Sequence, residues 1–292
     1  MQIRKTLLIV IGLLFFTGLA QEKRYDFTAF GYLPKVVSND YFLKLNNAQT
    51  KEIRFQYLDT ISLIYLRSGH ADSLMHYGKL LKEETLSDDL NSENTENFNL
   101  KAFYYQGVAA QKMGLLDEAI QSYIQGIEAS TSNDFIHKYL KLQLAETYLY
   151  KGELEKAKAV LEELPQLKRQ LDFYLKNGVV KSLFLIQNND YDLAKNIINK
   201  ALSENFVKDY PKLKLELELN LSKIQLRQEN YSELIKSSNS IKNNALNESF
   251  YDLYIEASLQ VGYAYARLKN YDVSEMALSS AYVNTIQYNG ID

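Results

Sequence analysis

The chain has 292 residues, of which 46% are hydrophobic and 24% are charged, and its formal net charge is −3. This near-balanced charge does not predict a nucleic-acid-binding surface, which is usually strongly basic. The absence of Cys excludes disulfides, thiolate nucleophiles and zinc–thiolate sites. The chain holds only 3 Pro and 12 Gly. Because sheet proteins need frequent turn residues, this composition favours an all-α chain with short connections.

The N-terminus has the three-part pattern of a secretory signal peptide. Arg4 and Lys5 precede an apolar or small stretch over residues 7–20, and the sequence turns polar at Gln21. The apolar stretch is shorter than the roughly 20 residues of a transmembrane helix. We expect residues 1–20 to be cleaved after Ala20 and the mature chain to be periplasmic or extracellular, with no membrane span. An uncleaved N-terminal anchor is the alternative.

Residues 21–52 are expected to form an irregular lead before a helical repeat domain over residues 53–292. The lead contains Pro34 and shows no clear period. Ser38 is a plausible N-cap, so one short helix is expected to start near it. The polar stretch over residues 86–97 predicts a loop inside the repeat domain.

The repeat is clearest over residues 100–133. A large residue is followed four positions later by a small one, then by a Gly turn, a small residue and an aromatic one, at Phe103, Gly107, Gly114, Ala119 and Tyr123. Gly107 would allow two helices to approach closely, and Gly114 tolerates the positive φ of a helix C-terminus. Ala119 and Tyr123 are four residues apart, so they share one face of the second helix.

The turn of this repeat recurs along the chain about every 37 to 45 residues. The predicted turn positions are Gly69, Gly114, Gly152, Asn189, Glu229 and Lys269. The packing residues match the pattern best around the second and third of these turns and least well around Tyr231. Each turn predicts a pair of antiparallel helices, so the sequence predicts one elongated repeat domain rather than several globular ones.

These motifs resemble the tetratricopeptide repeat family over about residues 53–288. The long spacing between turns is similar to that of exported bacterial members, including the repeat ectodomains of bacterial sensor kinases and helix-turn-helix regulators. The resemblance implies a right-handed α-solenoid of about six antiparallel helix pairs, whose first helices line a concave face.

The resemblance also implies which side chains point to the concave face. At the corresponding offsets stand Lys101, Tyr104, Lys112, Tyr139, Tyr150, Arg227, Tyr263 and Arg267. The same offsets include Arg67, Val108, Gln111, Glu146 and Glu256. Tyr side chains with a row of Arg and Lys suit an extended peptide or an acidic segment. The alternative is structural: basic residues at helix C-termini face the helix dipole, and Tyr residues pack between helices.

Catalytic and metal-binding motifs are not found in the sequence. The three histidines, His70, His76 and His137, lack the spacing of a zinc site, and no phosphate-binding or dinucleotide-binding glycine pattern occurs. The sequence therefore predicts a protein that is not an enzyme and needs neither metal nor cofactor. The expected function is an extracytoplasmic scaffold that binds a protein or peptide on its concave face. The alternative is a sensory ectodomain, or a truncated relative, of a bacterial membrane signalling protein.

Overall fold

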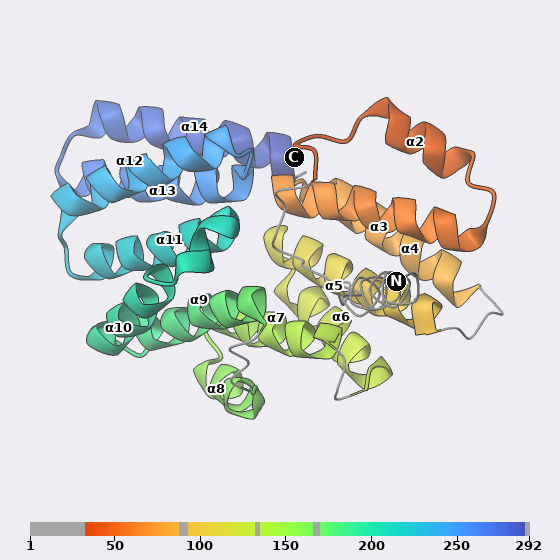
Figure 1. Ribbon diagram of the computed structural model, residues 1–292. Coiled ribbons are helices and arrows are strands. Elements are labelled where there is room, and N and C mark those ends of the chain that lie inside the picture. Colours follow the sequence, from red (N-terminus) through yellow and green to blue (C-terminus); the bar gives the residue numbers. More distant parts are fainter. Residues whose placement is uncertain (1–32, 88–92, 132–134, 166–169, 290–292) are drawn as a thin grey trace, which may run out of the picture.

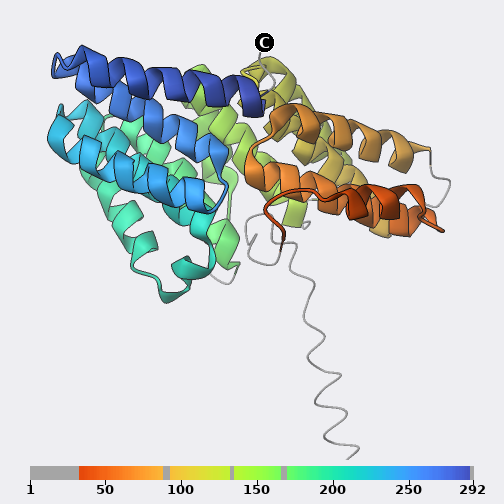
Figure 2. The same cartoon turned by 90° about the horizontal axis from the view of Figure 1, so that it is seen from above.

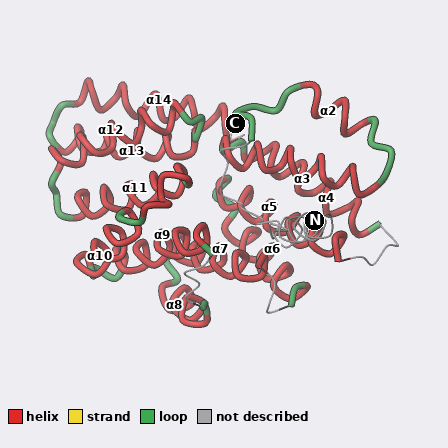
Figure 3. The backbone as a smooth tube through the Cα atoms, in the orientation of Figure 1, coloured by secondary structure: helices red, strands yellow, loops and turns green. Residues whose placement is uncertain are grey.

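The computed structural model describes residues 33–87, 93–131, 135–165 and 170–289. The expected signal peptide over residues 1–20 lies outside them. Within these ranges every regular element is a helix, as the composition predicts (Figure 3). None of the described helices combines the length and the apolar character needed to cross a membrane.

The described residues form antiparallel helix pairs, as the spacing of the turns predicts (Figure 1). The short helix α2 (Asn39–Asn46) comes first. The pairs that follow are α3 (Lys51–Ser68) with α4 (Ala71–Leu86), α5 (Glu93–Lys112) with α6 (Leu116–Ala129), α7 (Phe135–Lys151) with α8 (Leu154–Glu163), α9 (Leu171–Gln187) with α10 (Tyr191–Leu202), α11 (Pro211–Arg227) with α12 (Tyr231–Asn247), and α13 (Tyr251–Arg267) with α14 (Tyr271–Asn289). A 3-10 helix, η2 (Asn205–Asp209), precedes α11.

The turns within the pairs share one backbone geometry. All predicted turn positions have positive φ: Gly69 (83°), Gly114 (78°), Gly152 (80°), Asn189 (65°), Glu229 (58°) and Lys269 (62°). The next residue donates its N–H to the carbonyl five positions earlier, for example Leu115 to Ala110 at 2.9 Å. This is the hydrogen bond of a Schellman C-cap, which satisfies carbonyls at the helix end. The turn predictions are therefore confirmed.

Close packing inside a pair also follows the prediction. A Cβ atom added to Gly107 would lie 2.2 Å from Cε1 of Tyr123, so only glycine allows α5 and α6 to approach this closely. Ala119 and Tyr123 are both fully buried. The expected small and large residues thus form the interface between the two helices.

The pairs stack in two layers. The first helices of successive pairs pack against one another, α3 on α5, α5 on α7, α7 on α9, α9 on α11 and α11 on α13. We call α3, α5, α7, α9, α11 and α13 the inner helices. The second helices cover them from outside, and the apolar core lies between the layers, with Leu58, Tyr105, Tyr139 and Phe173 fully buried.

The stack turns back on itself, so that the first pair meets the last ones (Figures 1 and 2). Helix α14 contacts α4. Nη2 of Arg67, near the end of α3, lies 3.3 Å from Oε2 of Glu248, next to α13. The rings of Tyr251 and Tyr288 stack 3.9 Å apart, with the His70 ring edge-on to both. We call these contacts the seam. Because of the seam, the concave face expected from the family surrounds a central space that remains partly open to solvent.

One local expectation needs correction, and a second is confirmed in position but not in its side-chain hydrogen bond. The predicted loop over residues 86–97 is shorter, because α4 continues to Leu86 and α5 begins at Glu93; residues 88–92 lie outside the described ranges. A helix does follow Ser38, but the Ser38 side chain makes no cap hydrogen bond. Its backbone carbonyl instead accepts from N–H of Tyr41 at 3.1 Å.

Candidate functional site

The closed stack of helix pairs, which we call the ring, surrounds a cavity of about 400 Å³ that is partly open to solvent. Small-molecule sites in proteins usually measure about 300–1,000 Å³, so this volume can hold a ligand. Each inner helix contributes to the wall, as does the start of α6. Representative lining residues, one from each inner helix in order, are Leu66, Tyr104, Tyr150, Val179, Leu219 and Leu253.

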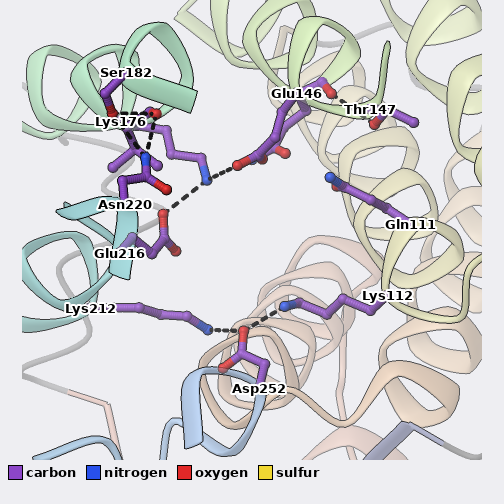
Figure 4. A network of polar contacts seen from close by, with 12 residues as sticks. Gln111, Lys112, Glu146, Thr147, Lys176, Ser182, Lys212, Glu216, Asn220 and Asp252 are labelled. Carbon is purple, nitrogen blue, oxygen red and sulfur yellow. Dashed lines mark hydrogen bonds and ion pairs between the residues drawn. The ribbon is translucent and has the colours of Figure 1, made fainter. Parts of the chain in front are cut away.

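On one side of the cavity, a lysine lies between two carboxylates (Figure 4). Nζ of Lys176 on α9 is 2.9 Å from Oε1 of Glu146 on α7 and 3.0 Å from Oε2 of Glu216 on α11. Burial disfavours the charge of Lys176, but the two carboxylates outweigh it and raise the pKa of this lysine. We call these three residues the acidic cluster, because two negative charges face one positive charge.

On the other side, a carboxylate lies between two lysines (Figure 4). Oδ2 of Asp252 on α13 is 2.5 Å from Nζ of Lys112 on α5 and 3.0 Å from Nζ of Lys212 on α11. We call these three residues the basic cluster. The two lysines favour the ionised form of Asp252. Burial works against ionised Asp252, but both lysines outweigh it and hold the pKa of the carboxyl well below its usual range.

The two lysines of the basic cluster differ. Burial disfavours the charge of Lys112, but Asp252 outweighs it and raises the pKa of Lys112. Burial lowers the pKa of Lys212, and repulsion from Lys112 adds to this effect. Nζ of Lys212 also donates to the carbonyls of Leu66 and Arg67, each at 3.2 Å, at the end of α3. The basic cluster therefore joins the cavity to the seam.

Helical spacing explains why polar groups share the cavity wall. Lys212, Glu216 and Asn220 follow one another at intervals of four on α11, so they lie on one face of that helix. Nδ2 of Asn220 donates to the carbonyl of Val179 and to Oγ of Ser182, both at 2.9 Å, and so fixes α11 against α9 (Figure 4). Polar pairs thus align the inner helices around the cavity.

Three of the predicted concave-face residues line the cavity: Tyr104, Lys112 and Tyr150. The neighbouring predicted positions Val108, Gln111, Glu146 and Glu256 line it as well. Tyr150 is 48% exposed and is one of the residues that line the cavity. Burial, together with the charge of Glu146, raises the pKa of Tyr150 well above its usual value. Its hydroxyl is therefore a neutral hydrogen-bonding group at physiological pH.

The other predicted residues do not line the cavity. Lys101 is buried, with Nζ 2.5 Å from Oδ2 of Asp59. Tyr139 is fully buried, and its hydroxyl donates to Oδ2 of Asp172 at 2.6 Å. Both side chains tie neighbouring inner helices together, which is the structural alternative raised by the sequence.

The three C-terminal candidates lie at the surface, away from the cavity. Arg227 is exposed, and Tyr263 is 48% exposed. Nε of Arg267 donates to the hydroxyl of Tyr231 at 3.1 Å. The predicted set therefore does not come together at one site: only Tyr104, Lys112 and Tyr150 meet at the cavity.

Sequence reasoning missed Lys176, Lys212, Glu216 and Asp252. The polar spacing on α11 was a usable signal, because Lys212, Glu216 and Asn220 recur at intervals of four and therefore share one helix face. The contact between Lys112 and Asp252, however, joins residues 140 positions apart. No local pattern contains that contact, since it depends on closure of the ring.

The cavity wall supplies charged, hydroxyl and amide groups suited to binding. Within the described ranges, no group of three or more His, Asp and Glu side chains is placed to hold a metal ion. The charged side chains of the wall are engaged with one another in ion pairs, including Lys223 with Glu256 at 2.7 Å.

Comparison with known proteins supports the architecture. A family profile described as "Tetratricopeptide repeat" matches residues 140–170, which include the Gly152 turn. The chain contains a tetratricopeptide repeat. No curated protein matches the chain. Such repeats form solenoids with extended binding surfaces, typical of protein-interaction scaffolds and not of enzymes.

A solved structure shows the same tetratricopeptide architecture. It is the crystal structure of a Signal Transduction ATPase with Numerous Domains protein with a tetratricopeptide repeat sensor, from Pyrococcus horikoshii. The two chains are 18% identical, with a TM-score of 0.53, over 86% of this chain and 40% of that one. At this identity the likeness concerns the fold alone. The chain spans less than half the length of that structure.

Proposed function

We propose that the chain is a non-enzymatic, extracytoplasmic scaffold that binds a protein or peptide partner on the inner face of its tetratricopeptide ring. The observation that carries this proposal is the cavity, because every inner helix contributes to its wall. A surface built from all the repeats is the one most directly shaped by the repeat architecture.

The chemistry of the inner face suits a peptide segment. Tyr104 and Tyr150 offer aromatic surface with a polar tip, a residue type enriched in protein interfaces. The ion pairs around them offer both signs of charge to backbone and side-chain groups of a partner. A partner that inserts a protruding segment can fill a space of about 400 Å³, whereas a partner with a flat surface cannot enter it.

The extracytoplasmic part of the proposal depends on the N-terminal sequence. Arg4 and Lys5 with the apolar stretch up to Ala20 support cleavage and export. Cell fractionation followed by N-terminal sequencing tests this part. The expected result is a mature chain that begins at Gln21 in the extracytoplasmic fraction. A chain retained in the cytoplasm with its original N-terminus would contradict export.

A pull-down with residues 21–292 from an extracytoplasmic extract tests partner binding. The matched variants are Tyr150→Ala inside the ring and Tyr282→Ala on α14, where the tyrosine is 67% exposed and does not line the cavity. Both changes remove an accessible aromatic side chain. We expect the partner to be lost by Tyr150→Ala and kept by Tyr282→Ala, with unchanged helical circular dichroism in both. Retention by Tyr150→Ala and loss by Tyr282→Ala would move the site to the outer surface.

A sensory role is the second candidate, because the solved structure with the same fold contains a tetratricopeptide repeat sensor. A sensor must change state when it binds, whereas a scaffold need not. Paired spin labels across the seam distinguish the two roles. A distance that changes when the captured partner is added supports the sensor. An unchanged distance supports the scaffold.

A further inference from the structure

The two charged clusters give the cavity opposite excess charges at opposite sides (Figure 4). In their ordinary ionised forms, Lys176 faces the two carboxylates of the acidic cluster, so one negative charge is in excess. The basic cluster has two lysines for one carboxylate, so one positive charge is in excess. The remaining pair of the wall, Lys223 with Glu256, is balanced. The charges of the cavity wall thus sum to zero, with the negative excess in the acidic cluster and the positive excess in the basic cluster.

Excess charge in a buried site is unfavourable unless a partner compensates it. The side chain of Lys212 is only 7% exposed and that of Lys176 only 8%. Oδ1 of Asp252 is buried and has no hydrogen-bond partner among the described residues. Lys212 of the basic cluster and Glu216 of the acidic cluster are four residues apart on α11, so the two clusters adjoin along one face of this helix. A single small ligand can therefore contact both.

Apolar side chains also line the cavity, beside the charged clusters and the amide groups. Val108, Leu183 and Leu219 line the space, together with the ring of Tyr150. A ligand that fits this arrangement carries a negative group, an apolar body and a positive group in a short molecule. The volume of about 400 Å³ suits a molecule of one or two amino-acid residues better than a long peptide.

We infer that the cavity is a binding site for a small zwitterion with an apolar body, of the size of a free amino acid or a dipeptide. Its carboxylate binds Lys112 and Lys212, and its ammonium group binds Glu146 and Glu216. This inference rests on the proposal that the inner face is the binding surface, and it names the ligand class. A dianion or a dication of the same size satisfies one cluster and is repelled by the other.

The test uses the purified full chain and isothermal titration calorimetry with the dipeptide leucyl-phenylalanine. Three forms are compared: free ends, N-acetylated, and C-amidated. Acetylation removes the positive charge and amidation removes the negative one, while the apolar body stays the same. We expect the free dipeptide to bind and each blocked form to bind at least roughly tenfold more weakly, since hydrogen bonds to charged groups are lost.

Two variants show which cluster binds the ammonium group of the ligand and which binds its carboxylate. Glu216→Gln removes the excess negative charge but leaves Lys176 paired with Glu146, and Lys112→Gln removes the excess positive charge but leaves Asp252 paired with Lys212. In Glu216→Gln, acetylation is expected to cost no further affinity, while amidation still does. In Lys112→Gln, amidation is expected to cost no further affinity, while acetylation still does. Lys141→Gln, which breaks an ion pair with Glu163 outside the cavity, is the matched control and leaves both penalties unchanged.

The outcomes separate this inference from the proposed function. Equal binding of the free and blocked dipeptides overturns the zwitterion site. No binding of any form also overturns it, and if Tyr150→Ala still loses the captured partner, the inner face remains the binding surface for a larger ligand. If no dipeptide binds and Tyr150→Ala keeps the partner, both the inference and the proposed function are wrong.

Discussion

The stack of helix pairs and the seam are held together by different kinds of contact. Neighbouring pairs meet through apolar surfaces and close glycine approaches, such as Gly126 on α6 against Leu140 on α7. At the seam, Arg67 meets Glu248 across 181 positions of sequence, and the ring of Tyr251 stacks on that of Tyr288. The packing of the stack is therefore determined by each repeat and its neighbour. The seam forms only if the curvature of the whole superhelix brings the first and last pairs together.

Buried charge lies in both regions, since Lys101 pairs with Asp59 inside the stack, but the groups that pair at the seam come from opposite ends of the repeat array. The side chain of Arg67 is 4% exposed, and burial lowers its pKa. Its guanidinium lies 5.3 Å from the centre of the Phe250 ring and donates to the carbonyl of Glu248. Buried charge contributes stability only while its partners stay in place. We therefore expect the ring to open at the seam more easily than the helix pairs separate from one another.

Asp252→Ala is expected to have the largest effect. It removes the only carboxylate of the basic cluster, and Lys112 and Lys212 then repel each other in a buried site. Loss of one partner of a buried ion pair costs about 3–5 kcal/mol. Urea unfolding monitored by circular dichroism gives the free energy of unfolding. Hydrogen exchange shows where the loss occurs: we expect faster exchange near the seam and unchanged protection in α7 to α10.

The same carboxylate predicts a pH dependence. The pKa of Asp252 is lower in the folded than in the unfolded chain, so its stabilisation is fully present above about pH 4 and is lost as pH falls further. The stability difference between the native chain and Asp252→Ala should therefore shrink on acidification. A difference that stays constant down to pH 3 would contradict the assignment.

Gly107→Ala is expected to have the next effect and to act on the stack. The new Cβ atom would lie 2.2 Å from Cε1 of Tyr123, so α5 and α6 must move apart. Overpacking of this kind costs about 1–3 kcal/mol. Thermal unfolding measures the loss, and Gly178→Ala is a suitable control because its nearest neighbour is 3.8 Å from the ideal Cβ position. Equal loss in both variants would contradict the close approach.

Gly114→Val is expected to have the smallest of these effects. The residue has φ of 78°, and nothing lies within 4 Å of an added Cβ atom, so only backbone strain opposes the change. The left-handed conformation costs about 1–2 kcal/mol for residues other than glycine. Gly114→Asn should cost less, because Asn189 adopts the same conformation in this chain. An unchanged melting temperature for Gly114→Val would argue against the role of this turn.

Local features of the fold were predictable from sequence, and long-range ones were not. The turns from Gly69 to Lys269 were predicted because each turn residue and the packing residues of the next helix recur at a regular spacing in the sequence. The same periodicity found Tyr104, Lys112 and Tyr150 on the cavity wall. It also selected Lys101 and Tyr139, whose long side chains reach Asp59 and Asp172 on neighbouring helices and are buried there.

Closure of the ring could not be predicted from the repeat sequences. It depends on small rotations between successive pairs, which add up along the superhelix. The sequence therefore predicted a concave face but not the closure of the ring, and the basic cluster was missed for the same reason. Asp252 also has no distinctive local context: an acidic residue in the first turn of a helix is common, since it interacts favourably with the helix dipole.

The most direct test of the closed ring is a distance across the seam. The chain has no Cys, so spin labels attach only at introduced cysteines. Asp72→Cys on α4 with Asn243→Cys on α12 spans the seam, and Glu155→Cys with Asp192→Cys spans two neighbouring pairs as a control; all four positions are exposed. The closed ring predicts a single narrow distance distribution for both pairs, with only the seam distribution broadened by Asp252→Ala. A broad seam distribution beside a narrow control in the native chain would show an open solenoid and contradict the enclosed cavity.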